Sequence, residues 1–531
     1  MLDLNIGAQE NLFPRMMNRT HQAGGRGMLR VSLSALLLLL TASLSCNQPE
    51  DPRPNVLWIV WDTVRADHLS LHGHERETTP FLDEWSREAR VYDNCLSTAG
   101  YTMPSHAAMF TGLMPSETCA DNARKRLDDR YTTLAELMTG AGYRSYLYSA
   151  NPNVSALRNL AQGFETVEHP WDPQFVDRAL ALVRGKLPEY DQSSELSKRL
   201  DDAEQGGGGM TPWNIKASGE LAQDATLAWL QGSDAKKPYF VFLNYMEAHR
   251  PYIPPRRFRE ILMDPEEVDL SYEVDRSWLT MWEYTFGLHD YNDLEMELTQ
   301  ATYDAAILEL DTMLSELLEG LRAEGHLDNT VVVLTSDHGE HLGEQHMLDH
   351  QYSVYQPLLR VPLIVHYPER FEPGHDDRPV MNFDLFPTLL ALAGIEEPAG
   401  LQSRAESLLD ASAERERVAE DPAYSPLGIR LVSQKNPDWD PSPWRRLQRA
   451  MIDDNDKFIW GSDGRHGLFD LAADPLETRN LIEEKPGRAA ELQQALAEFH
   501  RSLELCSITP APVEDLTPAQ RELLKSIGYT D

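Results

Sequence analysis

Residues 56–62 read VLWIVWD, an apolar run without a break that ends on a carboxylate. β-Branched and aromatic side chains favour an extended strand, and a run with no polar alternation is typical of a strand covered on both faces. Three more runs of this kind occur at residues 239–243, 331–335 and 361–365. We therefore expect these strands to form a parallel sheet buried in the interior.

Segments with helical spacing lie between the strands, at residues 132–140, 217–230 and 294–322. Strands that alternate with helices predict an α/β fold. The expected architecture is a large, mostly parallel sheet flanked by helices.

The chain changes character after residue 400. Residues 401–444 are polar and rich in charge and proline, with weak periodicity, and we interpret them as a transition. Beyond it we expect short antiparallel strands at 457–460 and 467–470 and a terminal helix. The sequence thus predicts a main domain, residues 53–400, followed by a smaller C-terminal α+β subdomain, residues 401–531.

The N-terminus carries the pattern of an export signal in residues 28–46. A basic start, a short leucine-rich run and small residues lead to Cys46, and the run is too short for a comfortable membrane span. Residues 1–27 are interpreted as a mis-assigned start or a disordered extension. Because the residues before Cys46 resemble a bacterial lipobox, we expect an exported protein of the periplasm or cell envelope, either tethered through a lipidated Cys46 or secreted.

The charge balance limits the partners. Asp and Glu outnumber Lys and Arg by 85 to 48, for a net charge of -37. This argues against binding nucleic acid, whose phosphates need basic side chains. An anionic substrate would be repelled at long range, so its site would need local positive charge, although the acid excess is also what a solvated surface gives.

The four cysteines include no CxxC pair, so a cysteine-based zinc site is disfavoured. Export permits a disulfide. Cys95 and Cys119 flank the segment discussed below as a candidate nucleophile loop, and they are a candidate pair.

Polar side chains of ligand type follow three of the apolar strands. Asp62 follows the first, His249 the strand at 239–243, and the pair Asp337-His338 the strand at 331–335. In open α/β sheets, ligands bind beyond the carboxyl ends of the strands, and carboxylate and imidazole together suit a divalent metal. A single Asp at such a place could equally cap a helix.

Thr102 stands two residues before Pro104, in a segment that reads as a loop running into a helix. Proline suits the first turn of a helix, and the free N–H groups of that turn favour an anion. A threonine hydroxyl is a poor nucleophile unless a metal ion activates it. Thr102 is therefore a candidate nucleophile, the alternative being that it only caps the helix.

Several motifs together resemble the sulfatase family of the alkaline phosphatase superfamily. They are RPNVL and DTVRAD from residue 53 to 67, TMPSHAAMFTG at 102–112, SDHGEHLGE at 336–344, and the later RVPLI and DPLE. The resemblance implies that a divalent metal (Zn, Mn, Ca or Mg) binds Asp62, Thr102, Asp337 and His338.

The resemblance also points to two further histidines. His249 takes the place of an active-site histidine of the family, and His350 falls where sulfatases usually carry a lysine and phosphoethanolamine transferases a histidine. His350 could instead be an exposed loop residue. If a second metal binds, His249 and His350 are the expected ligands.

The departures from the family pattern bear on the chemistry. Sulfatases carry Cys or Ser, oxidised to formylglycine, where this chain has Thr102, which cannot form that aldehyde. His106 replaces the arginine of the same motif, and Thr63 replaces a second metal carboxylate. We therefore expect no formylglycine, and we assign Thr102, His106, His249 and His350 as catalytic candidates.

A threonine nucleophile must pass its intermediate to water or another acceptor, which suits phosphoryl groups. The sequence thus favours a hydrolase of small phosphate or phosphonate esters. Three alternatives stay open: a sulfuric ester hydrolase without formylglycine, a transferase of phosphoryl headgroups, and an inactive protein that binds anions or carbohydrate.

Overall fold

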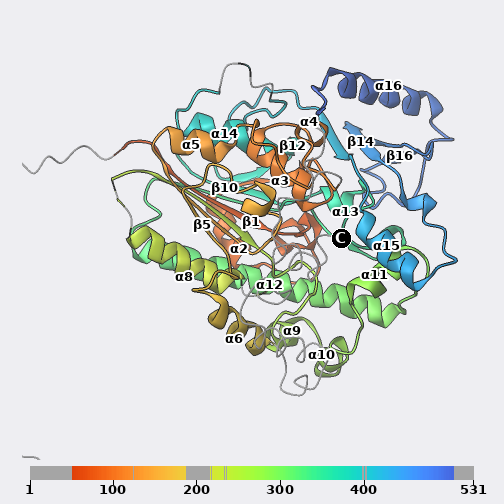
Figure 1. The fold of residues 1–531 in the computed structure, drawn as a ribbon, viewed down its shortest axis with the longest axis horizontal. Coiled ribbons are helices and arrows are strands. Elements are labelled where there is room, and N and C mark those ends of the chain that lie inside the picture. Colours follow the sequence, from red (N-terminus) through yellow and green to blue (C-terminus); the bar gives the residue numbers. More distant parts are fainter. Residues whose placement is uncertain are drawn as a thin grey trace, which may run out of the picture. The chain divides into compact units, whose positions relative to one another are not determined.

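The strand at the start of the catalytic region lies inside a mixed eight-stranded sheet (Figure 1). A computed structural model of the protein describes residues 51–122, 125–186, 216, 218–232, 234, 236–397, 400 and 403–507. The strand order is β11-β2-β10-β7-β1-β6-β4-β5. The strands are β1 (Asn55–Trp61), β2 (Arg90–Tyr92), β4 (Arg144–Ser149), β5 (Thr166–Glu168), β6 (Tyr239–Tyr245), β7 (Thr330–Thr335), β10 (Leu363–His366) and β11 (Gly374–Asp376).

Successive residues of the central strands pack into two separate cores, one on each face of the sheet. Leu57, Ile59 and Trp61 pack with α6 (Val176–Lys186), α8 (Ser218–Gln231) and α12 (Asp293–Ala323). Val56, Trp58 and Val60 pack with α3 (Thr102–Thr111), α5 (Leu134–Gly140) and α14 (Leu385–Leu392). Figure 1 shows these two helical layers on opposite sides of the sheet. Burial on both faces explains the unbroken apolar runs.

A second, antiparallel sheet lies in the C-terminal part. It runs β13 (Arg417–Asp421), β14 (Gln448–Asp453), β15 (Asp456–Gly461) and β16 (Gly467–Asp470), and α16 (Pro486–Ser502) packs on it. The expected α+β character of this part is confirmed. The chain from Asp51 onward forms one compact unit, so the division at residue 400 stays a prediction.

Smaller elements complete the two layers and the connections. They are α2 (Pro80–Trp85), β3 (Cys95–Leu96), α4 (Pro115–Thr118), α9 (Arg256–Leu262), α10 (Pro265–Ser271), α11 (Trp278–Thr285), β8 (His341–Leu342), β9 (Leu348–Asp349), α13 (Gln356–Leu359), β12 (Val380–Met381) and α15 (Pro426–Lys435). Among the helices that the structure describes, none combines the length and hydropathy that a bilayer crossing requires.

The predicted α/β class is confirmed, with two differences in detail. The strand expected at 361–365 is β10, which pairs antiparallel with β7, so this edge of the sheet is mixed. An apolar run predicts a strand but not its direction. The stretch interpreted as a transition contains β13 and α15. The export signal at 28–46 with Cys46, and residues 1–27, lie outside the described residues.

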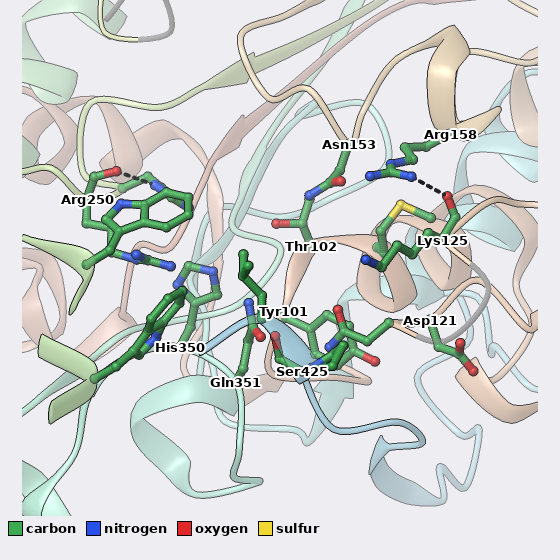
Figure 2. A pocket seen from close by; sticks show the side chains of 17 residues that line it. Tyr101, Thr102, Asp121, Lys125, Asn153, Arg158, Arg250, His350, Gln351 and Ser425 are labelled. Atoms are coloured by element: carbon green, nitrogen blue, oxygen red, sulfur yellow. Dashed lines mark hydrogen bonds between the residues drawn. The ribbon is translucent and has the colours of Figure 1, made fainter. Parts of the chain in front are cut away.

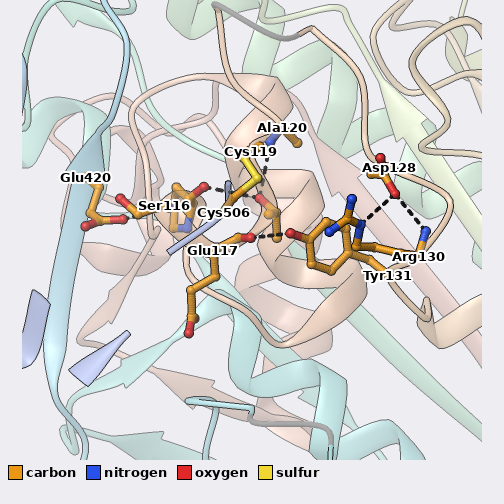
Figure 3. Close-up of a disulfide and its surroundings, with 11 residues drawn as sticks. Ser116, Glu117, Cys119, Ala120, Asp128, Arg130, Tyr131, Glu420 and Cys506 are labelled. Carbon is orange, nitrogen blue, oxygen red and sulfur yellow. Dashed lines mark hydrogen bonds and ion pairs between the residues drawn. A yellow bond between two sulfur atoms is a disulfide. The ribbon is translucent and has the colours of Figure 1, made fainter. Parts of the chain in front are cut away.

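The disulfide joins Cys119 to Cys506, so the pairing of Cys119 with Cys95 is wrong (Figure 3). Cys95 is a buried free thiol in β3, on the core side, while Cys119 follows α4. The Cys506 N–H donates to the Ser116 carbonyl oxygen, which draws the chain after α16 against α4. The sequence could not show this, because the partners are 387 residues apart.

Candidate active site

Parallel pairing brings the polar strand ends together. β1 pairs in register with β7 on one side and with β6 on the other, so Asp62 and Asp337 leave the sheet at the same edge. Arg65, in the loop after Asp62, links that loop to the loop after Asp337. It donates to the Glu340 carbonyl oxygen at 3.1 Å and to the Glu344 carboxylate at 2.7 Å, so the two loops are fixed to each other.

Thr102 is the first residue of α3, and Tyr101 before it holds the N-cap position. Thr102 therefore does not occupy the cap position, and Pro104 lies in the first turn as expected. The Thr102 hydroxyl is 3.4 Å from Nε2 of His338. Ser105 donates to the Asp337 carbonyl oxygen at 2.7 Å, which fixes the start of α3 against the loop after β7.

Asp62, Asp337 and His338 form a fully buried cluster whose ligand atoms lie within 4.8 Å of one another. Asp62 Oδ1 and Asp337 Oδ2 are buried and accept no hydrogen bond from the part of the chain that the structure describes. Burial raises the pKa of both carboxyls to about 7, and for Asp62 the charge of Asp337 adds to it. Buried carboxylate oxygens that accept no hydrogen bond are suitable ligand atoms for a divalent cation.

His338 presents a lone pair to this cluster. Its Nδ1 lies 2.8 Å from the Gly339 carbonyl oxygen, which can only accept, so Nδ1 carries the proton and Nε2 is bare. Burial lowers the pKa of His338 to about 3. A neutral imidazole with its second nitrogen held by a carbonyl is the usual form of a metal ligand. Gly339 must be glycine here, because a Cβ would meet the Pro357 carbonyl oxygen at 2.0 Å.

Thr63 contributes its backbone rather than a ligand. Its φ of 64° is in the left-handed region, and its N–H donates to Asp337 Oδ1 at 3.3 Å. Its hydroxyl donates to the carbonyl oxygen of Asp62 at 2.7 Å.

Two asparagines that the sequence did not reveal hold Asp62. Asn151, after β4, donates to Asp62 Oδ2 at 2.7 Å and to the Thr102 hydroxyl at 3.3 Å. Asn244, in β6, donates to the same Oδ2 at 3.1 Å. Their position at the ends of neighbouring strands was the only sign in the sequence that they could belong to the site. An asparagine by itself does not indicate such a role.

The rings of His249 and His350 lie 5.0 Å apart, and their pKa values are shifted in opposite directions. His249 Nδ1 is 2.6 Å from the Arg250 carbonyl oxygen, so its Nε2 is bare, and burial holds its pKa well below the usual value. Lys216 donates to the carbonyl oxygens of Met246 and His249, which fixes this loop.

His350 instead contacts two carboxylates, Asp349 at 2.9 Å and Glu340 at 3.2 Å. Burial alone would lower its pKa, but these two charges outweigh it and raise the pKa to about 10. The two carboxylates therefore favour the protonated form of the His350 ring. It is buried, so the reading as an exposed loop histidine is wrong.

Asp349 is in turn held by other side chains. Arg250 donates to it at 2.5 Å and the Trp282 indole at 2.7 Å, and the Arg250 guanidinium stacks over Trp278 at 3.9 Å. This network fixes the orientation of His350 from behind.

His106 lies behind Thr102, one turn along α3. Its Nδ1 is 3.1 Å from the Thr102 carbonyl oxygen and 3.4 Å from Asp337 Oδ2, and its ring packs on Phe110 and Phe242. Burial lowers its pKa to about 3. His106 thus supports the start of the helix and is absent from the lining of the pocket described next.

A pocket opens onto Thr102 (Figure 2). His249 and His350 line it together with side chains from the loops after α4, β4 and β13 and from α11. The lining residues are Tyr101, Thr102, Met103, Asp121, Asn122, Lys125, Asn153, Arg158, His249, Arg250, Trp278, Trp282, His350, Gln351, Ser425, Pro426 and Leu427. Of these, the sequence predicts Thr102, His249 and His350 as site residues.

The family model described as "Sulfatase" matches residues 54–395. The chain belongs to the sulfatase family. It is a hydrolase of sulfuric or phosphoric esters in the alkaline phosphatase superfamily.

Curated relatives of this sulfatase include arylsulfatase K of Xenopus laevis, 24% identical over 84% of this chain and 82% of that protein. The N-acetylglucosamine-6-O-sulfatase of Bacteroides thetaiotaomicron is 24% identical over 89% and 92%. Among solved structures, the phosphonate monoester hydrolase of Agrobacterium radiobacter has a TM-score of 0.64 at 18% identity and covers 85% of this chain and 96% of its own. A structure solved with D-glucosamine-2-N,6-O-disulfate reaches 0.63 at 20% identity, over 85% and 98%.

Thr102 is the residue at which this sulfatase departs most from the resemblance that its motifs carry. Its hydroxyl lies at the head of α3, 3.4 Å from Nε2 of His338.

Proposed function

We propose that the protein is an exported, metal-dependent hydrolase of small phosphate or phosphonate esters, diesters above all, with Thr102 as nucleophile. The observation that carries this proposal is the Thr102 hydroxyl, uncapped at the head of α3 and 3.4 Å from His338 Nε2. A threonine cannot form the aldehyde on which sulfate release through formylglycine depends.

Asp62, Asp337, His338 and Thr102 are the residues that would hold the cation. A divalent ion bound there would lower the pKa of the Thr102 hydroxyl and neutralise charge on the transferred group. Asn151 adds an N–H to the same oxygen, and the free N–H groups at the start of α3 favour the anionic group.

The remaining steps fall to the two histidines. The Thr102 oxygen, which has lost its proton to solvent, forms a bond to phosphorus as the bond from phosphorus to the ester oxygen breaks, and the ester oxygen leaves as an alcohol with the proton of His350 Nε2. Water then attacks phosphorus as the bond to the Thr102 oxygen breaks, and it gives a proton back to His350 Nε2, so both residues return to their starting forms and the phosphorylated product is released. The bare Nε2 of His249 accepts a hydrogen bond from the attacking water. His106 supports the helix behind the nucleophile and takes no part in proton transfer.

The disulfide supports the export part of the proposal, since disulfides persist in oxidising compartments. We propose residues 28–46 as the signal and Cys46 as a possible lipid anchor in the periplasm or cell envelope.

The phosphonate monoester hydrolases among the structural neighbours favour phosphorus esters, whereas the curated relatives are named sulfatases. The alternative function is accordingly a sulfuric ester hydrolase that works without formylglycine. An inactive anion-binding protein would need another reason for keeping the hydroxyl beside the acid–histidine cluster, whereas a headgroup transferase would use the same nucleophile and differ only in the acceptor.

Matched 4-nitrophenyl esters test the proposal. The purified protein, supplied in turn with Mn, Zn, Ca or Mg, should release 4-nitrophenol from a phosphodiester or phosphonate faster than from the sulfate. Thr102→Ala should lose at least about a thousandfold in kcat, since the residual rate would rest on binding and electrostatics alone.

Mass spectrometry of the quenched reaction should find phosphate on the peptide with Thr102 and no formylglycine. A sulfate ester cleaved faster than the phosphodiester would overturn the substrate preference. Full activity of Thr102→Ala would overturn the nucleophile.

A further inference from the structure

Arg250 is a buried arginine in the lining of the pocket at Thr102 (Figure 2). It is 2% exposed, and Figure 2 shows its side chain on the same side of Thr102 as that of His350. Arginine is almost never buried to this degree unless it is paired, and buried N–H groups are nearly always hydrogen-bonded. Each N–H group of this side chain should therefore have an acceptor.

One edge of the Arg250 guanidinium is already used within the protein. Its Nε donates to Asp349 at 2.5 Å, and Asp349 also contacts His350 at 2.9 Å. The guanidinium lies over the ring of Trp278 at 3.9 Å and is 5.0 Å from the centre of the Trp282 ring. The ion pair and the two indoles thus hold the guanidinium in one orientation.

The other edge of the guanidinium carries the Nη groups, and these have no acceptor in the part of the chain that the structure describes. Nη1 is buried without a hydrogen bond, and Nε is the one nitrogen of the side chain that donates to a described acceptor. A buried donor without an acceptor costs free energy, because its hydrogen bond to water is lost and not replaced. Since the side chain lines the pocket, a bound ligand is the acceptor that would remove this cost.

A short series of contacts connects Arg250 to the candidate nucleophile. The Thr102 hydroxyl is 3.4 Å from His338 Nε2, and the ring of His338 is 4.7 Å from the ring of His350. His350 in turn shares Asp349 with Arg250. A ligand bound over Thr102 therefore has the imidazole of His350 and the guanidinium of Arg250 beside it.

We propose that the Nη groups of Arg250 donate hydrogen bonds to a non-bridging oxygen of the ester group bound over Thr102. A guanidinium offers fixed, paired N–H groups that match an oxyanion, and its hydrogen bonds to a charged oxygen are strong. This inference rests on the proposed function in placing the ester group at Thr102. It makes Arg250 a catalytic residue, in addition to its contact with Asp349, through which it positions His350.

Binding of unreactive oxyanions to the Thr102→Ala protein, supplied with Mn, tests this role without turnover. In calorimetric titrations with phenylphosphonate, adding Arg250→Gln should weaken binding about ten- to a hundredfold, the effect of one or two charge-assisted hydrogen bonds. Adding Arg250→Lys should weaken it less, since Lys keeps the charge but not the paired N–H groups.

Arg256→Gln is the matched control. Arg256 stands six residues further along, pairs with Glu260 and Asp269 at 2.7 Å, and is not in the lining of the pocket. Its substitution should leave the affinity for phenylphosphonate equal to that of the Thr102→Ala parent. Thermal unfolding of each variant shows whether the fold is kept.

Asp349→Asn separates direct contact from positioning. This variant removes the carboxylate through which Arg250 acts on His350, and it leaves the guanidinium in place. In the otherwise wild-type protein it should lower kcat. In the Thr102→Ala protein it should not weaken phenylphosphonate binding, because it removes a negative charge near the ligand. Ethylguanidinium added to Arg250→Ala should restore part of the lost binding, and ethylammonium should restore less.

Benzenesulfonate distinguishes this inference from the proposed ester class. If the anion whose affinity depends on Arg250 were benzenesulfonate rather than phenylphosphonate, the preference for phosphorus esters would be wrong and the role of Arg250 would stand. Equal affinities in the Arg250→Gln and Arg256→Gln variants would overturn that role. Equal losses in Arg250→Gln and Asp349→Asn, or a parent protein that binds neither anion, would overturn it as well.

Discussion

Asn151 is the residue through which the candidate nucleophile and the candidate metal ligands are joined. Its side-chain N–H donors reach both Asp62 and the Thr102 hydroxyl. Asn244 reaches Asp62 alone. Asn244 therefore supports only the candidate metal ligand Asp62, whereas Asn151 also supports the Thr102 oxygen that is proposed to attack the substrate.

We expect Asn151→Ala to lower kcat about 10- to 1,000-fold, the cost of removing a donor to an oxygen that carries charge in the reaction. Asn244→Ala should lower kcat less, and mainly through weaker metal binding that excess metal restores. Steady-state kinetics at increasing metal concentrations measures the loss of kcat in each variant and the part of it that metal restores. Equal losses in the two variants, both rescued by metal, would show that Asn151 acts only on Asp62.

His350 offers a second test at this scale, because its neighbours hold it as a cation. We expect His350→Lys to retain more activity than His350→Gln, since Gln removes the positive charge that Glu340 and Asp349 both contact and leaves Asp349 with Arg250 alone, while Lys keeps that charge. Thermal unfolding of both variants separates loss of the fold from loss of the reaction. If Gln matched Lys in rate and in unfolding temperature, the charge of His350 would be irrelevant.

The sequence placed Asp62, Thr102, Asp337 and His338 as one group, and the fold does bring them together. It did so because each ends a strand or begins a helix within a recognisable motif. Lys125 and Arg158 carried no such signal, since they reach the pocket from loops whose path depends on the whole fold.

At the scale of elements, the apolar runs predicted strands β1, β6 and β7 and the helical spacing predicted α5, α8 and α12, because a buried face imposes its period on the sequence. The direction of β10 and the existence of α15 could not be predicted in this way. α15 is a short helix of mixed apolar and polar residues within a polar stretch of weak periodicity, and pairing direction is decided by partners far along the chain.

The contact of α12 with the loop after β1 predicts a pH-dependent stability. Asp304, in α12, is buried and contacts His68 at 2.6 Å, Arg76 at 2.8 Å and His74 at 3.1 Å. Burial alone would raise the pKa of Asp304, but the hydrogen bonds from His68 and His74 outweigh it and hold the pKa below its usual range. An acid with a lowered pKa stabilises the fold above its unfolded pKa of 3.8, and this contribution is lost as the pH falls below that value.

Asp304→Asn should therefore lower the free energy of unfolding by about 2–4 kcal/mol at pH 7 and by much less at pH 3. Urea unfolding at a series of pH values measures the difference. Glu297→Gln, on an exposed position of the same helix, is the control and should change little at any pH. A deficit that is as large at pH 3 as at pH 7 would exclude the ionised carboxylate as its cause.

The Cys119–Cys506 disulfide fixes the segment after α4 to the end of α16. Opening it should lower the free energy of unfolding by about 2–5 kcal/mol, since it constrains a long loop of the unfolded chain. A reductant should thus lower the unfolding midpoint of the wild type and leave that of a Cys119→Ser, Cys506→Ser double variant unchanged. If the reductant did not change the unfolding midpoint of the wild type, the disulfide would add nothing to the stability of the fold.

At the scale of the whole molecule, the acidic composition and the basic pocket are both needed to understand the protein. Net charge can be read from the sequence, but the sides of the pocket cannot, because they combine residues from the loops after α4 and β4 with residues after β6 and β9. By its composition the chain would need local positive charge to bind an anion, and only the fold shows where basic side chains line a pocket.

The two carboxylates at the centre of the sheet edge connect the metal to the stability of the whole molecule. Asp62 and Asp337 are fully buried, and each has an oxygen without a hydrogen bond from the described residues. A cation bound between them offsets their desolvation and mutual repulsion, so it should stabilise the fold in proportion to its affinity and concentration. Prolonged treatment with a chelator should abolish activity and lower the unfolding temperature by several degrees, and Mn or Zn should restore both.

Asp337→Asn distinguishes this account from a general effect of the chelator. Without metal, the variant should be as stable as the metal-free wild type or more so, because one of two like charges is gone. With metal, it should gain far less than the wild type does. Calorimetric unfolding of both proteins, with and without the ion, gives the four temperatures needed, and an equal gain in the two proteins would place the metal elsewhere and leave Thr102 without its activating partner.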